Sequence, residues 1–190
     1  MRKLTTLFVF IGLLAACKKS NQNGGSGSGS IQGNWKFLYL AATTRENTAS
    51  AGGYSSTTFT SYKTIDNGGT VTFTADSMKV TGLTYSVNTT ATSYIYIGNV
   101  LQDSLSLPFT FTLPATTESI VIKAVGNDSL YAPNGGIMPA NYTGVTVSAS
   151  QPSGVHYVIS HDTLEMTEIA TFSASGATVS AVSDMFLLRQ

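Results

Sequence analysis

The chain has 190 residues, enough for one domain with a substantial core, and its formal net charge at pH 7 is zero. Charged residues make up 11% of the chain, well below the roughly 25% that is usual for soluble domains. Four of the ten basic residues lie before residue 20, so the rest of the chain carries six basic against ten acidic residues and lacks the basic surface that a nucleic-acid partner requires.

The N-terminus has the pattern of a secretory signal. Arg2 and Lys3 precede an apolar run over residues 4–14, which is too short for a permanent membrane-spanning helix. The run leads into Leu14-Ala15-Ala16-Cys17, and Cys17 is the only cysteine, which excludes an internal disulfide and a multi-cysteine metal site. This stretch resembles a bacterial lipoprotein signal, in which small residues precede a cysteine that becomes the lipidated N-terminus. The alternative is a free, buried cysteine.

The lipoprotein resemblance implies a location. Residues 1–16 would be the signal peptide, and Cys17 would carry acyl chains such as palmitate, which hold a protein on a membrane without a spanning helix. Lys18 after the cysteine, where an aspartate would retain the protein elsewhere, implies the bacterial outer membrane; the periplasmic and surface faces both stay open. Residues 17–30 read as a flexible Gly/Ser tether that reaches about 20 Å as a random coil, although a cloning linker has the same composition.

Residues 31–190 alternate apolar and polar side chains with a period of two, which predicts an all-β, antiparallel domain of about eight to ten strands. Trp35, Phe37 and Tyr39 share one face of the first strand, and Asp66-Asn67-Gly68-Gly69 predicts a hairpin turn. Two prolines predict an edge strand or strand ends around Phe109–Leu113. The expected strands are 33–39, 57–65, 71–73, 77–87, 93–97, 109–113, 119–125, 145–149, 155–160, 163–172 and 179–188.

A triplet of aspartate, a hydroxyl residue and an apolar residue occurs four times, beginning at Asp76, Asp103, Asp128 and Asp162. The structural interpretation is that aspartate closes a turn and a strand then begins with an inward apolar side chain. The triplet also resembles the acceptor of an O-glycosylation system of some Gram-negative bacteria, which implies a glycan on the hydroxyl group.

Four short segments together resemble a bacterial lipocalin-like lipoprotein: Gly33-Asn34-Trp35, residues 72–76, residues 82–87 and the closing Phe186-Leu187-Leu188-Arg189. The family implies an up-and-down antiparallel β-barrel over residues 31–190 that either holds one small ligand or is filled by side chains. It also implies that Gly33 and Trp35 close the narrow end and that Arg189 stacks on Trp35. The other signature segments of animal lipocalins are not evident, and an antiparallel β-sandwich is the alternative fold.

The chain offers little catalytic chemistry. His156 and His161 are the only histidines, and on one strand they would point to opposite faces, which argues against a shared metal site. Neither a GxSxG elbow nor a phosphate-binding glycine loop is present. We therefore expect a protein that is not an enzyme and has no metal and no cofactor.

Two functions remain open. The first is the binding of a small, partly apolar ligand or a glycan inside the barrel, with walls from Tyr94, Tyr96, Phe109 and Phe111. The long loop over residues 131–144 would supply Ile137, Met138 and Tyr142 as a cover for the mouth, or would be a plain exposed connection; residues 45–58 are expected to form a second loop at the same rim. The second function is a structural or interaction module with a filled barrel that contacts a protein or polysaccharide through its loops. The oligomeric state stays open.

Overall fold

The structure is a computed structural model of the chain, and it describes residues 29–138, 141–142, 145–146, 152–174 and 176–190. Cys17 and all but the last two residues of the expected tether therefore lie outside the described residues. Among the described residues, no helix is long and apolar enough to span a membrane. The strands are β1 (Gly33–Ala49), β2 (Tyr54–Lys63), β3 (Ile65–Phe73), β4 (Ser77–Ile97), β5 (Val100–Val121), β6 (Lys123–Val125), β7 (Ser129–Ala132), β8 (Asn141–Tyr142), β9 (Val145–Thr146), β10 (Ser153–Ser160), β11 (Thr163–Ala174) and β12 (Ala177–Arg189).

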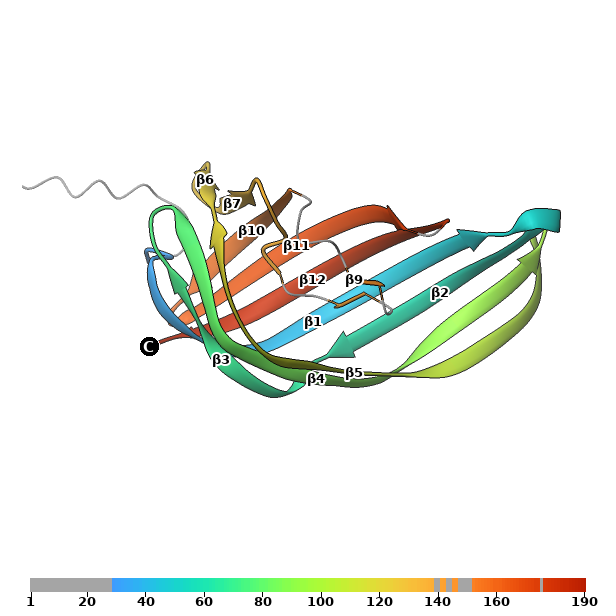
Figure 1. The fold of residues 1–190 in the computed structure, drawn as a ribbon, viewed down its shortest axis with the longest axis horizontal. Coiled ribbons are helices and arrows are strands. Elements are labelled where there is room, and N and C mark those ends of the chain that lie inside the picture. Colours follow the sequence, from blue (N-terminus) through green and yellow to red (C-terminus); the bar gives the residue numbers. More distant parts are fainter. Residues whose placement is uncertain (1–28, 139–140, 143–144, 147–151, 175) are drawn as a thin grey trace, which may run out of the picture.

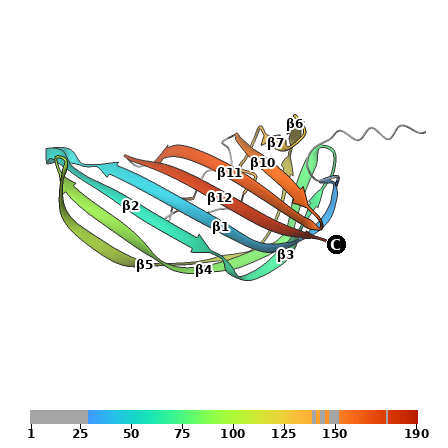
Figure 2. The ribbon, with the colours of Figure 1, turned by 180° about the vertical axis from the view of Figure 1, so that it is seen from behind.

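The expected all-β, antiparallel fold is confirmed. Within the described residues, ten of the strands form one sheet, and β8 and β9 form a separate small ribbon. The first strand lies at the centre of the sheet, because β1 pairs with β12 on one side and with both β2 and β3 on the other. Figures 1 and 2 show that the sheet is strongly curved and elongated.

The turn predicted at Asp66–Gly69 is wrong, because these residues lie inside β3 and the chain does not reverse there. Both β2 and β3 run antiparallel to β1 and to β4, so they form one interrupted strand between those two neighbours. The positive φ angles of Asp66 and Gly69, 54° and 107°, accompany shifts in the β3–β4 register. A Cβ atom at Gly69 would lie 2.6 Å from Cα of Leu83, so this glycine permits a close approach of two backbones.

The sheet is ring-like, but it does not close as a complete barrel. Edge strand β5 pairs with β4 as far as Val121, and after one residue the same stretch of chain continues as β6, which pairs with β7 at the opposite edge. The ring is thus joined by the continuity of the chain, and over residues 100–120 the other side of β5 pairs with no described strand. The prediction that Pro108 and Pro114 mark an edge strand is confirmed, since proline lacks the N–H group that a second neighbour would need.

The first strand, β1, pairs with the last strand, β12, in the middle of the sheet. Trp35 lies opposite Arg189, and Cζ of Arg189 is 4.3 Å from the centroid of the Trp35 ring, which is the stacking expected from the sequence. Trp35 is fully buried, and its Nε1–H donates to the carbonyl of Ile31 at 2.8 Å. Nη2 of Arg189 donates to the carbonyl of Ser30 at 2.8 Å. These contacts tie the start of the described chain to its end, and Gly33 enters β1 with a φ of 127°.

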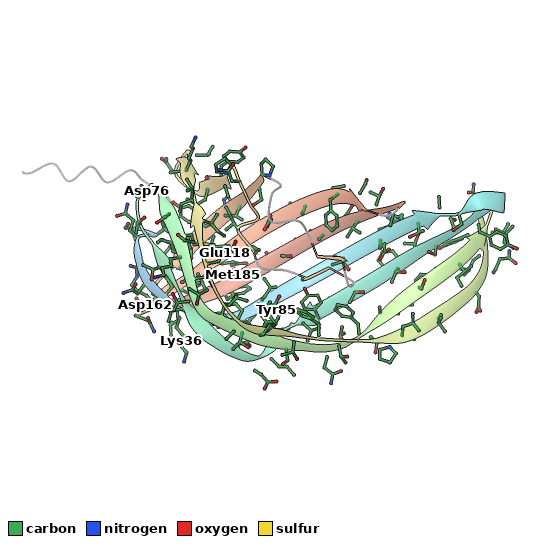
Figure 3. The ribbon with its side chains drawn as sticks, in the orientation of Figure 1. Lys36, Asp76, Tyr85, Glu118, Asp162 and Met185 are labelled. Carbon is green, nitrogen blue, oxygen red and sulfur yellow. The ribbon has the colours of Figure 1, made fainter. Side chains whose placement is uncertain are left out.

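Two regions of the molecule differ in packing. The region around Trp35, which we call the closed end, holds the main hydrophobic core; Figure 3 shows Tyr85 and Met185 inside it and Lys36, Asp76 and Asp162 around its outside. The other region, which we call the arm, comprises residues 42–49, 54–62, 87–97, 100–111, 170–174 and 176–182 and extends to the opposite end in Figure 1. The tip of the arm is the connection between β1 and β2. Residues 45–58, expected to form a loop, are mostly strand there.

Hydroxyl side chains stabilise the arm. Thr58 donates to Oγ of Ser93 at 3.1 Å across β2 and β4, and the Oγ1 of Thr43 lies 3.4 Å from Oγ of Ser61 across β1 and β2. Such cross-strand pairs contribute roughly 0.2–1 kcal/mol each. The arm therefore depends on backbone ladders and polar pairs more than on a two-sided hydrophobic core.

Three of the four aspartate triplets fit the structural interpretation. Asp76, Asp128 and Asp162 lie between strands, and each is followed two residues later by a buried apolar side chain on the next strand: Met78, Leu130 and Leu164. Asp103 does not fit, because it lies inside β5. Its carboxylate accepts from the backbone N–H of Ser104 at 2.7 Å.

We predict that Arg189→Met lowers the melting temperature by about 2–4 °C, because it removes a cation–π contact and a hydrogen bond worth roughly 1 kcal/mol together. Thermal unfolding followed by circular dichroism measures the effect. Lys36→Met is the matched control, because Lys36 also lies in the sheet and its exposed side chain carries the same positive charge. Equal shifts in the two variants would show that the stacking on Trp35 contributes nothing.

Candidate functional site

The interior of the closed end is packed with side chains. Trp35, Phe37, Met78, Met166 and Leu187 belong to one buried cluster, each with at most 2% of its surface exposed. Interiors of this kind have the density of organic crystals. A ligand surface inside the sheet would therefore have to lie on the concave face beyond this core.

Aromatic side chains continue from the core toward the arm on the concave face. The ring centroid of Tyr85 lies 6.2 Å from that of Phe37 and 6.1 Å from that of Phe111, and Tyr62 lies 6.1 Å from Phe109. Phe109 and Phe111 are partly buried against the core cluster. These two predicted wall residues therefore lie where the packed interior gives way to the arm.

The structure does not bring Tyr94 and Tyr96 to that surface. Tyr94 lies opposite Thr57 and packs edge-on against Phe59, with ring centroids 6.0 Å apart. On the same side, Cζ of Arg45 lies 5.5 Å from the centroid of the Phe59 ring. Positions 94 and 96 alternate with the concave-face positions 93 and 95 of β4, so both tyrosines face outward. The predicted pocket of four aromatic residues is wrong, because β4 and β5 both present odd-numbered positions to the concave face in this region, whereas Tyr94 and Tyr96 are even-numbered.

The concave face of the arm carries an apolar strip. Its residues were not among those predicted from the sequence. Leu105 and Leu107 of β5 are 48% and 45% exposed, and at the tip Ile97 and Val100, opposite each other, are 42% and 64% exposed. Leu107 lies opposite the buried Ala91, which fixes its side of the sheet. The signal was present in the sequence, since Leu105, Leu107, Phe109, Phe111 and Leu113 alternate without interruption.

Small side chains form a row across the arm beside this strip. In register, Ala181 of β12 lies opposite Thr44 of β1, Thr44 opposite Thr60 of β2, and Thr60 opposite Ala91 of β4. Thr44 and Thr60 are buried, and neither hydroxyl oxygen has a hydrogen-bond partner within the described part of the chain. A buried hydroxyl without a partner costs roughly 1–3 kcal/mol, so this row carries two unused hydrogen-bonding groups at an energetic cost.

Two residues that were expected to help cover the mouth, Ile137 and Met138, instead lie in the interior. Ile137 and Met138 are buried in the core cluster, with 0% and 6% of their surfaces exposed. The backbone N–H of Ile137 donates to Oγ of Ser153 at 2.9 Å, and that of Met138 donates to Oε2 of Glu168 at 3.2 Å. The side chain of Tyr142 lies outside the described residues.

Glu168 is the buried acid of this region. It lies on β11 between Val155 and Ser183, with 6% of its surface exposed. Burial raises the pKa of its carboxyl group above the usual value, and hydrogen bonds with the Ser153 side chain and the Met138 backbone oppose that rise. The acid holds the segment at residues 137–138 against the sheet.

The two histidines make separate contacts within the described part of the chain. His156 faces outward on β10, and its Nε2 lies 3.1 Å from Oδ2 of Asp128. His161 lies in the turn after β10, and its Nδ1 lies 3.3 Å from Oγ of Ser160. Among the described residues, no group of three or more His, Cys, Asp and Glu side chains is placed to hold a metal ion.

We predict that Glu168→Gln changes the free energy of unfolding more favourably at pH 7 than at pH 4. Because the folded-state pKa of Glu168 is raised, the wild type loses stability as the pH rises from the unfolded-state pKa near 4.5 through the folded-state pKa, by at most about 1.4 kcal/mol per pH unit. Glutamine keeps an acceptor for the Met138 N–H and carries no charge. Denaturant unfolding at several pH values measures the slope, and a variant with the same pH dependence as the wild type would contradict a buried, titrating Glu168.

Comparison of the chain with family models, with curated proteins and with solved structures found no match. The case for a function therefore rests on the arrangement of residues described above.

Proposed function

We propose that the protein is a non-enzymatic, lipid-anchored member of the lipocalin-like lipoproteins of the bacterial outer membrane, and that it binds a small, partly apolar ligand on the concave face of its arm. The observation that carries the proposal is the exposed apolar strip of Leu105 and Leu107 beside the row of Thr44 and Thr60. The strip matches the apolar part of a ligand, and the hydroxyl groups match its polar part.

The strip supports ligand binding because water contact with these side chains is unfavourable. Each fully buried leucine contributes roughly 1.5–3 kcal/mol relative to an exposed one, and Leu105 and Leu107 keep about half of their surface in water. Phe109 continues the same line toward the core. An extended hydrocarbon chain laid along β5 would remove these surfaces from water together, whereas a globular glycan would gain little from them.

The two threonines support a polar group on the ligand. Sites of this kind are lined mainly by apolar side chains, with a few polar groups that set the orientation of the ligand. The hydroxyls of Thr44 and Thr60 lie on adjacent strands and have no other described partner. Both hydroxyl groups are buried, so a carboxylate or hydroxyl group on the ligand would have to displace the atoms that cover them, and it would then remove the cost of leaving them unpaired.

The position of the tether gives the protein an orientation under this proposal. Ser30 and Ile31, where the tether ends, are bound to Arg189 and Trp35 at the closed end. A lipid on Cys17 would therefore hold the closed end near the membrane, within the roughly 20 Å that the Gly/Ser-rich composition of the roughly 13 residues after Cys17 predicts for their reach. The arm would then extend away from the membrane surface.

The second candidate is a structural or interaction module that contacts a protein or a polysaccharide. It is favoured by the packed interior of the closed end, where the core cluster, including Ile137 and Met138, occupies the volume that a lipocalin-like ligand would need. This candidate predicts no saturable binding of small lipids. Titration with a fatty acid therefore distinguishes ligand binding from the interaction module.

We predict that the double variant Leu105→Asp/Leu107→Asp weakens binding of a fluorescent fatty acid at least tenfold, because it places two charges in the apolar strip. Ser104→Asp/Ser106→Asp is the matched control, since it adds the same charges to alternate positions of the same strand. Fluorescence titration measures the affinity. Equal binding by both variants, or no saturable binding by the wild type, would exclude the strip as the site and favour the interaction module.

We predict that a metabolic fatty-acid label attaches to the wild-type protein and not to Cys17→Ala, because only the cysteine of the signal can accept the acyl chains. Gel fluorescence of labelled cells, followed by fractionation of membranes, measures both lipidation and location. Labelling of the variant would overturn the anchoring part of the proposal and leave the ligand site untouched.

A further inference from the structure

A second candidate site lies on the outer face of the sheet, away from the arm. It is an open groove of about 380 Å³ over β6, β7, β10 and β11. Its lining includes Val125, Tyr131, Gly154, His156, Thr167 and Ile169. Tyr131 and Ile169 alternate with the buried Leu130 and Glu168, so their side chains point outward, and they are 39% and 76% exposed.

Gly154 forms the floor of this groove. On one side, Gly154 of β10 lies opposite Tyr131 of β7. On the other side, the pairing of Val155 with Glu168 places Gly154 next to Ile169 of β11. A glycine between two large side chains leaves a gap that any other residue would fill. The width of the groove therefore follows directly from the missing side chain.

The fold does not require glycine at position 154. Its φ angle is not positive, and a Cβ atom there would meet only the carbonyl oxygen of Leu130 at 3.6 Å, an ordinary contact. Glycine inside a strand is destabilising, and it often marks a place where a ligand approaches the backbone closely. A residue that weakens the strand and is not needed for its geometry indicates a use for the open space.

The polar end of the groove has a defined hydrogen-bonding state. Oδ2 of Asp128 lies 3.1 Å from Nε2 of His156, and because a carboxylate only accepts, Nε2 carries the proton. In the neutral imidazole Nδ1 is then an acceptor, and it has no partner among the described residues. Thr167 uses its hydroxyl proton to donate to Oδ1 of Asp184 at 2.7 Å. The groove thus offers mainly apolar walls and an acceptor nitrogen.

We propose that this groove binds a small aromatic molecule that carries a hydroxyl group. The flat ring would pack on the Gly154 backbone between Tyr131 and Ile169, where aromatic pairs favour offset or edge-on contact. The hydroxyl group would donate to Nδ1 of His156. A sugar fits less well, because most of its hydroxyl groups would face Val125, Ile169 and the tyrosine ring without partners.

The test uses three probes with the full folded domain: phenol, toluene, which lacks the hydroxyl group, and methyl α-glucoside. Titration followed by ¹H–¹⁵N correlation spectra should show saturable shifts at Gly154 and His156, with phenol binding about tenfold more tightly than toluene and the glucoside not binding. Gly154→Val should raise the melting temperature and weaken phenol binding at least tenfold. Ser160→Val is the control, because it places the same side chain on the same face of β10 outside the groove.

Several results would overturn the proposal: unchanged phenol affinity in Gly154→Val, tighter binding of the glucoside than of phenol, or shifts confined to the concave face. His156→Phe should leave toluene binding in place and remove the preference for phenol, which a purely structural histidine would not do. The variant Leu105→Asp/Leu107→Asp should bind phenol normally, so the failure of one site is distinguishable from the failure of the other.

Discussion

The pairing of the first strand with the last is the constraint on which the rest of the molecule depends. β1 and β12 share a ladder from Trp35–Arg189 at the closed end to Thr48–Ala177 near the tip of the arm. The stack of Arg189 on Trp35 fixes one end of that ladder, and the contacts of Ser30 and Ile31 anchor the entering chain there. Because β1 also pairs with β2 and β3, both halves of the sheet are positioned relative to this one strand.

Irregularities in the strands decide which side chains meet. β2 and β3 form an interrupted strand, and the register of β3 against β4 shifts between Ile65 and Thr70. In β4 the buried positions are even-numbered up to Val80 and odd-numbered from Leu83 onward. The change occurs at Gly82, whose φ is 61°. One shift of this kind moves every later side chain of a strand to the other face. This is the reason that Phe109 and Phe111 face inward while Tyr94 and Tyr96 face outward.

The closed end and the arm differ in what stabilises them. The closed end has the buried aromatic and aliphatic core, and the arm has long strands, paired hydroxyl groups and one edge that no described strand covers. Natural proteins protect such edges from pairing with other chains, and Pro108 and Pro114 on β5 do so here by removing N–H donors. With the edge protected, the concave face of the arm can remain exposed without the sheet extending into another molecule.

The sequence by itself determined the fold class and the edge position of the proline-bearing strand, because alternation and proline chemistry are local features. It also gives the expectation of a lipid on Cys17, which lies outside the described residues. The contact between Trp35 and Arg189 was expected only from the lipocalin-like resemblance. Only the tertiary structure decided that the ring stays incomplete, that Asp66–Gly69 is not a turn, and that residues 45–58 are mostly strand. These depend on register and on bulges, which bring together residues far apart in the chain. For the same reason the row of Thr44 and Thr60, the burial of Glu168 and the gap at Gly154 are not readable from the sequence: each exists only because neighbouring strands place particular residues side by side.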